Sequence, residues 1–437
     1  MESRAKLFRT FRKVVASILP WKIQRFAYRR LAKRYIDRIL IPPDPSLRTI
    51  LLINHFFNQD LKAILYANQG RYRIQVVDAP ALFRGAKIFF ERDVIALRAS
   101  YETTPKSMRQ EYALECKWIM DQIEKEQSID LLVATSDTFY WIRELIVVAQ
   151  SRGIRAVVVD KEGTISPYAY DAVVKWIVDF APFMSDHIYV WSERQKEFWE
   201  KTGVEESRIT VVGQPRSDLF YIEHENTVDQ YFKTSQPLVT YFIFDDKAYI
   251  PREMLDKGMN WSRLKAETMS DLTALASEFF NINFVVKSHP QQSDLEELQK
   301  TYGIDNLVVL GGSEISNELI LRSEMIIGFQ TTALIEAMFL NKRVIYTAWD
   351  EDYKSHLRPE LLPIHEAPGI VVAETREQFR NVVRQVLAGN FSSFEFDEPT
   401  LEARRSFVNE YFYKPDGHVC ERLFAEFDRL LNAAPVQ

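Results

Sequence analysis

A strand, a turn and a helix follow one another at residues 325–337, which read Met325-Ile326-Ile327-Gly328-Phe329-Gln330-Thr331-Thr332-Ala333-Leu334-Ile335-Glu336-Ala337. Three apolar residues run into a glycine, and the threonines that follow are favoured at the start of a helix. Free backbone N–H groups at such a start attract anions. The stretch therefore predicts a βα unit of a parallel sheet whose turn, at Gln330, Thr331 and Thr332, binds a phosphate. Glu336 on the helix is expected to accept a hydrogen bond from a ribose or sugar hydroxyl.

The same alternation of short apolar runs and helical patterns extends over most of the chain. Strands are expected at residues 49–54, 73–77, 130–134, 156–160, 187–191 and 209–212, and again at 238–244, 283–287, 307–310, 325–327, 343–346 and 369–372. This alternation is typical of βαβ units, and 437 residues suit two domains. We predict two Rossmann-like, doubly wound α/β domains at residues 41–230 and 231–398, followed by helices at 399–437 that pack across both domains.

The composition indicates a globular protein without a bound metal or cofactor. Hydrophobic residues make up 46% of the chain and charged residues 27%, as in ordinary globular domains. The two cysteines, Cys116 and Cys420, stand in no zinc-binding or disulfide pattern. No apolar run reaches the length of a membrane span.

The first forty residues form a separate, basic segment. They carry twelve Lys or Arg residues against two acidic ones, a net charge of +10, whereas the rest of the chain has a net charge of −16. Apolar residues recur there at helical spacing on both sides of Pro20, as in helices that lie on anionic lipid. Because the chain does not begin with a secretory signal, we expect residues 1–40 to attach a cytoplasmic protein peripherally to the inner face of the plasma membrane. The alternative is a helical pair packed on the body, and no nucleic-acid partner is expected.

Three further motifs stand at expected strand ends, where ligands bind in open α/β sheets. They read Lys287-Ser288-His289-Pro290, Asp160-Lys161-Glu162-Gly163 and Gly213-Gln214-Pro215-Arg216-Ser217-Asp218. The first can contact phosphate oxygens and balance the charge of a leaving nucleotide. In the second, Glu162 is placed to act as a general acid or base, with Lys161 and Gly163 beside the substrate. The third contributes Gln214 and Arg216 as expected substrate contacts. For each motif the alternative is a turn or a helix cap that binds no ligand.

Together the motifs resemble those of the GT-B glycosyltransferases of bacterial surface carbohydrates, over residues 130–425. Lys287-Ser288-His289-Pro290 is similar to the HP motif, and the stretch 330–337 to the Ser/Thr motif, of the CMP-sugar users among them, the sialyl-, polysialyl- and Kdo-transferases. The resemblance implies an acceptor site in the first domain, a donor nucleotide in the second, and no metal. It predicts transfer of Kdo or another nonulosonic acid from a CMP-sugar to a surface polysaccharide or glycolipid. Lys161 stands where the family's acidic-acidic-Gly pattern has its first acidic residue. The resemblance therefore implies an acid/base role for Glu162 alone.

The expected mechanism uses Lys287 and His289 to stabilise the leaving phosphate and Glu162 to activate the acceptor hydroxyl. A retaining double displacement also needs a carboxylate nucleophile. Asp245 and Asp246 follow the first strand expected in the second domain and are the candidates for that role. The alternative is that these two aspartates cap the following turn.

Three other classes of function stay open, namely polymerases that use CDP-glycerol, enzymes that use NDP-sugars, and a non-catalytic scaffold. The motifs also resemble those of CDP-glycerol polymerases, which share the HP and Ser/Thr features. In the pattern of these polymerases a second histidine, in the first half of the chain, is followed by glycine. Here His55 is followed by Phe56 instead, which disfavours this alternative. NDP-sugar transferases and sugar 2-epimerases share the fold as well. A non-catalytic nucleotide- or carbohydrate-binding scaffold is the third alternative, and the presence of Glu162, His289 and the 330–332 turn favours an enzyme over it.

Overall fold

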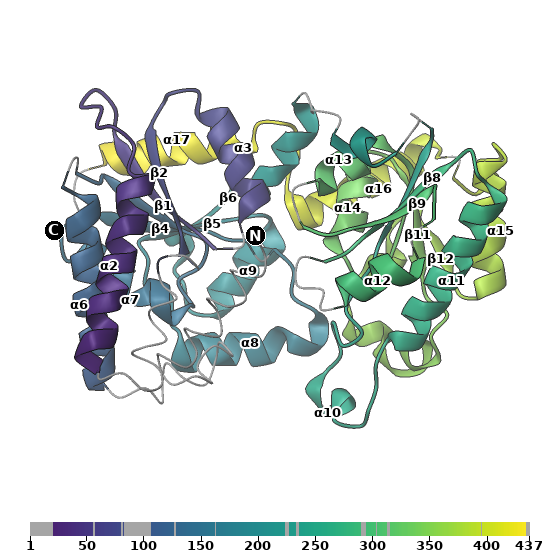
Figure 1. Cartoon of the computed structure of the whole chain (residues 1–437), viewed down its shortest axis with the longest axis horizontal. Helices are drawn as coiled ribbons and strands as arrows, with labels where there is room; N and C mark the ends of the chain where they lie inside the picture. The colour runs from purple at the N-terminus through teal and green to yellow at the C-terminus, as the bar shows by residue number, and fades with distance from the viewer. Residues whose placement is uncertain are drawn as a thin grey trace.

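The structure is a computed structural model that describes residues 21–55, 57–79, 82, 106–125, 128–161, 163–222, 227–232, 236–289, 294–302, 304–312, 315–394 and 396–433. It contains two parallel six-stranded sheets with flanking helices, which lie side by side along the long axis of the molecule (Figure 1). The predicted α/β fold of two Rossmann-like, doubly wound domains is thereby confirmed.

The first sheet has the strand order β2-β1-β3-β4-β5-β6. Its strands are β1 (Thr49–Asn54), β2 (Arg73–Asp78), β3 (Leu131–Ala134), β4 (Arg155–Val159), β5 (His187–Val190) and β6 (Ile209–Val211), and its helices are α3 (Asn58–Asn68), α6 (Lys106–Ile123), α7 (Tyr140–Gln150), α8 (Pro167–Phe180) and α9 (Glu193–Lys201). Both faces of β1 are buried, because Leu51 and Ile53 pack with α6 and α7 while Ile50 and Leu52 belong to a core on the other face. A strand buried on both faces reads as a continuous apolar run, which is why the sequence shows these strands clearly.

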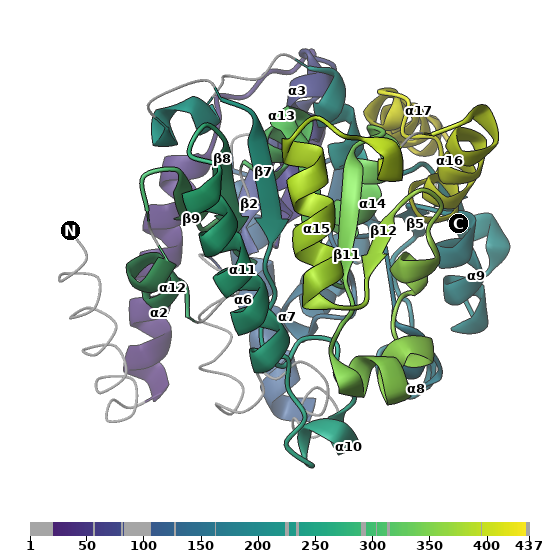
Figure 2. The same cartoon turned by 90° about the vertical axis from the view of Figure 1, so that its right-hand side faces the viewer.

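The second sheet has the order β12-β11-β10-β7-β8-β9. Its strands are β7 (Leu238–Phe242), β8 (Asn283–Lys287), β9 (Leu307–Leu310), β10 (Ser323–Gly328), β11 (Arg343–Thr347) and β12 (Val371–Ala373), and its helices are α10 (Arg252–Leu255), α11 (Ser262–Glu278), α12 (Leu295–Tyr302), α13 (Ser316–Arg322), α14 (Thr332–Phe339) and α15 (Arg376–Leu387). Figure 2 shows α11 and α15 on one face of this sheet. The strand order reverses between β7 and β10, and in the first sheet between β1 and β3. These reversals are where open α/β sheets bind ligands.

Two C-terminal helices link the halves of the molecule. The helix α16 (Glu398–Phe412) contributes Val408, Tyr411 and Phe412 to the core of the second sheet. The chain then returns, and α17 (Val419–Asn432) packs Leu423 and Phe424 against the first sheet (Figure 1). The domain limits predicted from the sequence stay a prediction, since the structure gives the sheets but no boundary between domains.

The basic segment is described from its second helix onward, and residues 1–20 lie outside the described residues. The helix α2 (Trp21–Ile39) buries Tyr28, Ala32 and Ile36 in the core beside α6. Arg29 pairs with the fully buried Glu115 of α6, at 2.8 Å between Nε and Oε2. This helix is therefore packed on the body through one face. None of the helices in the described part of the chain is long and apolar enough to cross a membrane.

Candidate functional site

The first-sheet edge is formed by the residues that directly follow β1, β3 and β4. His55 follows β1, Ser136 and Thr138 follow β3, and Lys161 follows β4. Because β1 and β3 flank the reversal of strand order, His55 stands at the position where this topology binds ligands. The hydroxyls of Ser136 and Thr138 lie 2.8 Å apart.

His55 is almost completely buried at this edge. Its ring meets the ring of Phe139 edge-on, with 4.8 Å between centroids, and the Lys161 ammonium lies 5.5 Å from the same Phe139 ring. Burial and then the charge of Lys161 lower the pKa of His55 to about 4. Its imidazole is therefore neutral at pH 7, which is the state required of a general base.

Glu162, the predicted acid/base, lies outside the described residues, whereas Asp160 and Gly163 of the same motif are described. The Asp160 carboxylate accepts hydrogen bonds from Gln195 Nε2 at 2.8 Å and from Trp199 Nε1 at 2.9 Å, so it holds α9 to the sheet. Gly163 packs directly on Trp191, and a Cβ atom at this position would lie 1.7 Å from the Trp191 ring. The glycine of the motif is therefore required for close packing.

The second-sheet edge is formed by the residues that follow β7, β8 and β10, which are neighbours in the sheet. Lys287 ends β8 and is only 2% exposed. Its Nζ donates to the carbonyl oxygen of Ser288 at 2.5 Å, and burial lowers the pKa of its ammonium to about 8. His289 is exposed at this edge, and Pro290 lies outside the described residues. Of the two predicted phosphate contacts, the structure thus exposes His289 and buries Lys287.

The turn after β10 contains one residue with a structural role, Gln330, and two candidate ligand contacts, Thr331 and Thr332. Gln330 has a positive φ of 44° and is fully buried. Its Nε2 donates to Tyr346 and to the Leu362 carbonyl at 2.8 Å, and its Oε1 accepts the Leu362 amide at 3.1 Å. Its side-chain amide is therefore engaged within the fold, and the expected nucleotide contact of Gln330 stays a prediction. Thr331 caps α14 by accepting from the Ala333 amide at 3.3 Å, and Thr332 begins the helix.

Glu336, Gln214 and Arg216 were expected to contact ligands, and the structure brings them together instead. The Glu336 carboxylate on α14 lies 3.1 Å from Arg216 Nε and 3.3 Å from Gln214 Nε2. Gln214 and Arg216 belong to the first half of the chain, in and before the short helix η4 (Pro215–Tyr221). The three side chains thus join the two sheets, and Glu336 is engaged with protein groups rather than open to a ribose.

Asp245 and Asp246 follow β7, as predicted, and both have local partners. Asp245 Oδ1 accepts the Lys247 amide at 3.0 Å. Asp246 accepts from the Ser262 hydroxyl at 2.9 Å and pairs with the ammonium of Lys265. This geometry is that of turn-capping and ion-paired carboxylates, the alternative that the sequence left open.

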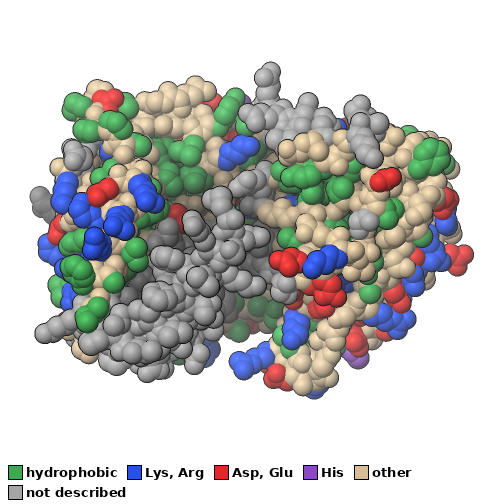
Figure 3. All heavy atoms as spheres, viewed as in Figure 1, with side chains coloured by type: hydrophobic (Ala, Val, Ile, Leu, Met, Phe, Trp, Pro, Cys, Tyr) green, Lys and Arg blue, Asp and Glu red, His purple; other side chains and the backbone are tan. Residues whose placement is uncertain are grey.

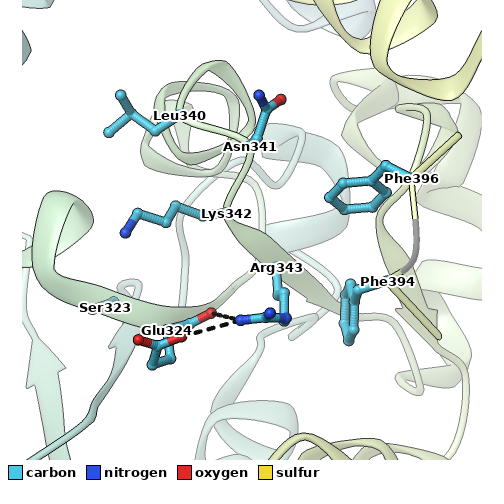
Figure 4. Close-up of a pocket in the computed structure, with 8 residues that line it drawn as sticks. All are labelled: Ser323, Glu324, Leu340, Asn341, Lys342, Arg343, Phe394 and Phe396. Atoms are coloured by element: carbon cyan, nitrogen blue, oxygen red, sulfur yellow. Dashed lines mark hydrogen bonds and ion pairs between the residues drawn. The ribbon is translucent and has the colours of Figure 1, made fainter. Parts of the chain in front are cut away.

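A pocket of about 300 Å³ lies at the opposite edge of the second sheet (Figure 4). Ser323 begins β10 and Arg343 begins β11, so the pocket marks the amino ends of these strands. Arg343 lies 3.1 Å from Glu324 and its guanidinium stacks on Phe391. Since ligands bind at the carboxyl ends of strands in this topology, this pocket is separate from the candidate site. Among the described residues no group of three or more His, Cys, Asp or Glu side chains is placed to hold a metal ion, and the absence of a metal stays a prediction.

Comparisons with known proteins agree with this arrangement. The family model of CDP-glycerol:poly(glycerophosphate) glycerophosphotransferases matches residues 178–426, more than half of the chain. The wall teichoic acid polymerase TagF superposes with a TM-score of 0.56 at 10% identity, over 98% of this chain and 98% of that one. The S. aureus protein MnaA, in a co-structure with UDP, gives 0.53 at 13% identity, over 90% of this chain and 99% of its own. A UDP-N-acetylglucosamine 2-epimerase gives 0.53 at 13% identity, over 90% and 98%. At these identities the structures show the fold alone, and no curated protein sequence matches the chain.

Proposed function

The chain belongs to the CDP-glycerol:poly(glycerophosphate) glycerophosphotransferase family, and we propose from this premise that it transfers a glycerophosphoryl unit from a CDP-activated donor to a polymer hydroxyl. The observation that carries the proposal is the extent of the family match, which includes every strand of the second sheet and both predicted donor motifs. A TagF variant soaked with CDPG supports a donor of the same type. The CMP-sugar donor expected from the sequence gains no support from these relatives, whereas the CDP-glycerol alternative does.

The chemistry follows from the bonds in such a donor. An acceptor hydroxyl oxygen attacks the phosphorus that carries glycerol and forms a new phosphodiester bond. The bond from this phosphorus to the bridging oxygen breaks, CMP leaves with that oxygen, and the hydroxyl proton passes to a base. No anomeric carbon takes part, so the reaction needs no carboxylate nucleophile. The proposal therefore gives Asp245 and Asp246 only the turn-capping and ion-pairing roles that their contacts support.

We assign the acceptor base to His55. Its neutral state and its place at the reversal in the first sheet support this role. Lys161 supplies a positive charge at the same edge, which suits a phosphate-containing acceptor. Glu162 stays the alternative base, on the sequence motif alone. The sequence motifs do not select His55, because Phe56 rather than glycine follows it. Its position directly after the first strand is the signal that could have identified it.

The donor phosphates are assigned to the second-sheet edge. His289 is exposed there, and the N-terminal turn of α14 begins with the hydroxyls and backbone N–H groups of Thr331 and Thr332, while the Ala333 amide is bonded to Thr331. Helix N-termini bind phosphate through these groups. Phosphoryl transfer depends on positioning and on neutralisation of the charge that the leaving group gains. His289 and the α14 turn are the groups that supply this neutralisation.

Turnover with a panel of activated donors tests the proposal. The full-length protein is incubated with a poly(glycerophosphate) acceptor and with CDP-glycerol, CMP-sugars or UDP-sugars in turn, and nucleotide release is measured by chromatography. We expect release from CDP-glycerol, dependent on the acceptor, that exceeds release from every sugar donor. Faster turnover of a CMP-sugar would contradict the proposal and indicate a glycosyltransferase that uses CMP-sugars.

We also propose that α2 lies on an anionic membrane surface. The face of α2 turned away from the body exposes Ile23, Phe26 and Leu31, with Phe26 67% exposed, together with Arg30 and Arg34. Figure 3 shows Lys and Arg side chains interspersed with hydrophobic ones along this helix. Exposed apolar residues among cations are typical of helices that bind the lipid interface. A polymerising enzyme that acts on a membrane-attached acceptor would benefit from this contact.

Replacing Arg30, Arg34 and Arg38 with alanine should weaken binding to vesicles that contain anionic lipid by about 10²-fold, at about 1 kcal/mol per charge near the surface. Substitution is preferable to deletion of residues 1–40, because α2 also buries core residues and pairs with Glu115. The control replaces Lys201, Lys300 and Arg405, which are exposed on other helices. Equal loss of binding in both triple variants would contradict a role for α2.

A further inference from the structure

Arg216 lies where the two halves of the molecule meet. Its backbone N–H donates to Asp60 Oδ1 at 3.1 Å, and its Nη1 lies 3.6 Å from Asp60 Oδ2. Its Nε lies 3.1 Å from Glu336 Oε1. Asp60 belongs to the first turn of α3 and Glu336 to α14, and both are buried, at 1% and 5% exposure. One guanidinium therefore holds two buried carboxylates that come from opposite sheets.

The same side chain reaches a third element. The guanidinium carbon of Arg216 lies 4.9 Å from the centre of the Trp191 ring, and this ring is packed against Gly163. Asp60 lies in the helix that follows His55, Gly163 follows Glu162, and Glu336 lies one turn beyond the start of α14. Arg216 thus contacts, directly or through Trp191, the segments that carry the proposed acceptor-side groups and the helix α14 on the donor side.

We propose that Arg216 is a positioning residue, which holds the donor helix α14 at a fixed distance from the acceptor segments through its pairing with Glu336 and Asp60. This inference rests on the proposed function for its account of what is positioned. The physical basis is charge. Without the guanidinium, two buried carboxylates face each other across the seam between the sheets, and their repulsion and their demand for water favour separation.

Charge also argues against a second reading, in which the substrate contact expected of Arg216 is a direct bond to the donor phosphate. The positive charge of the Arg216 guanidinium is already neutralised by its two carboxylate partners. A phosphate would have to displace one of these carboxylates to bind there. The two readings predict opposite effects for Glu336→Gln. If Arg216 positions α14, this substitution weakens the link and lowers kcat. If Arg216 is a phosphate ligand, it releases the guanidinium and tightens donor binding.

The test compares the full-length wild type with Arg216→Met, Arg216→Lys, Glu336→Gln and the Arg216→Met/Glu336→Gln double variant. We expect Arg216→Met to lower kcat by about 10²-fold, the scale of a misplaced reacting group, while the Kd for CDP-glycerol from calorimetry stays at the wild-type value. Arg216→Lys keeps the charge and should recover part of kcat. The double variant should be no slower than Arg216→Met, because the two residues act as one pair.

A matched control is Arg376→Met. Arg376 pairs with the buried Asp271 at 2.7 Å, but both residues belong to the second half, on α15 and α11. Its loss should cost stability and leave kcat of the folded protein unchanged. A rise in the Kd of Arg216→Met as large as its fall in kcat, or an unchanged kcat, would overturn the proposal.

Hydrogen exchange separates failure of this inference from failure of the proposed function, because it needs no substrate. In Arg216→Met, amide exchange should rise in both α3 and α14, whereas in Arg376→Met both helices should keep the wild-type rate. If the wild type does not turn over CDP-glycerol, the proposed function fails, and the exchange data still decide whether Arg216 joins the two elements. Wild-type exchange rates in both helices of Arg216→Met would contradict the pairing.

Discussion

Replacing His55 with alanine should lower kcat by about 10²–10⁴-fold, the usual contribution of a positioned general base. The side chain stands at the reversal of strand order in the first sheet and is neutral at pH 7. Its loss would leave the acceptor hydroxyl without a group to receive its proton. His187→Ala is the matched control, because burial also lowers the pKa of His187 to about 4. His187 begins β5, at the opposite edge of the same sheet, and bonds Thr210 at 2.8 Å. We expect its removal to leave kcat of the folded protein unchanged.

The pH dependence gives a second readout of the same prediction. Because burial and Lys161 lower the pKa of His55 to about 4, the free enzyme keeps the base form at all pH values well above 4. The kcat/KM profile should therefore be flat from neutral pH toward pH 5 and fall as the pH drops through about 4. Anionic donor and acceptor phosphates raise the pKa of a nearby histidine, so the acid limb of kcat should lie at higher pH than that of kcat/KM. Full activity of His55→Ala would move the base role to Glu162.

Replacing His289 with alanine should lower transfer by about 10²-fold or more, the scale for removing one electrostatic stabiliser of a leaving group. The loss should fall on kcat more than on donor affinity, since the leaving phosphate gains charge only as the bond breaks. His418→Ala is the control, because His418 is exposed at the start of α17 and pairs with Glu421 at 3.0 Å. An equal effect of the two substitutions would remove His289 from the mechanism.

The neighbouring Lys287 predicts an alkaline limit. Burial lowers the pKa of its ammonium to about 8, so its positive charge is present below that pH and is lost as the pH rises through it. The ammonium bonds the Ser288 carbonyl rather than a phosphate, so it acts through its charge at the second-sheet edge, and the loss of that charge should weaken donor binding above pH 8. Lys287→Met should abolish this dependence and keep the buried volume filled.

The fold was predictable because its signals are local. Strands such as β8 are buried on both faces and appear as apolar runs. The cap of α14 was predictable as well, because Thr331 binds an amide only two residues away. In both cases the physical cause of the structure lies within one element of the chain, where periodicity and residue type report it directly.

The roles of other site residues depend on tertiary pairing, which periodicity does not contain. Gln330 stands in a motif that suggests a ligand contact, yet its amide bonds the backbone of Leu362. Glu336 and Arg216 each suggest a substrate contact, yet they bond each other across the two sheets. The residue after His55 does not match the family pattern, and the case for His55 as the base comes instead from strand order, with β1 between β2 and β3. Short-range patterns give the candidate residues, and only the structure gives the partners that these residues bond.

The nucleotide released in a single turnover with CDP-glycerol shows which bond of the donor breaks. The donor and a poly(glycerophosphate) acceptor are mixed with excess enzyme, and the nucleotide product and the acceptor mass are measured together by mass spectrometry. Attack at the glycerol-bearing phosphorus predicts release of CMP and an acceptor that is heavier by one glycerophosphoryl unit. Release of CDP with transfer of glycerol alone, or an unchanged acceptor, would contradict the account.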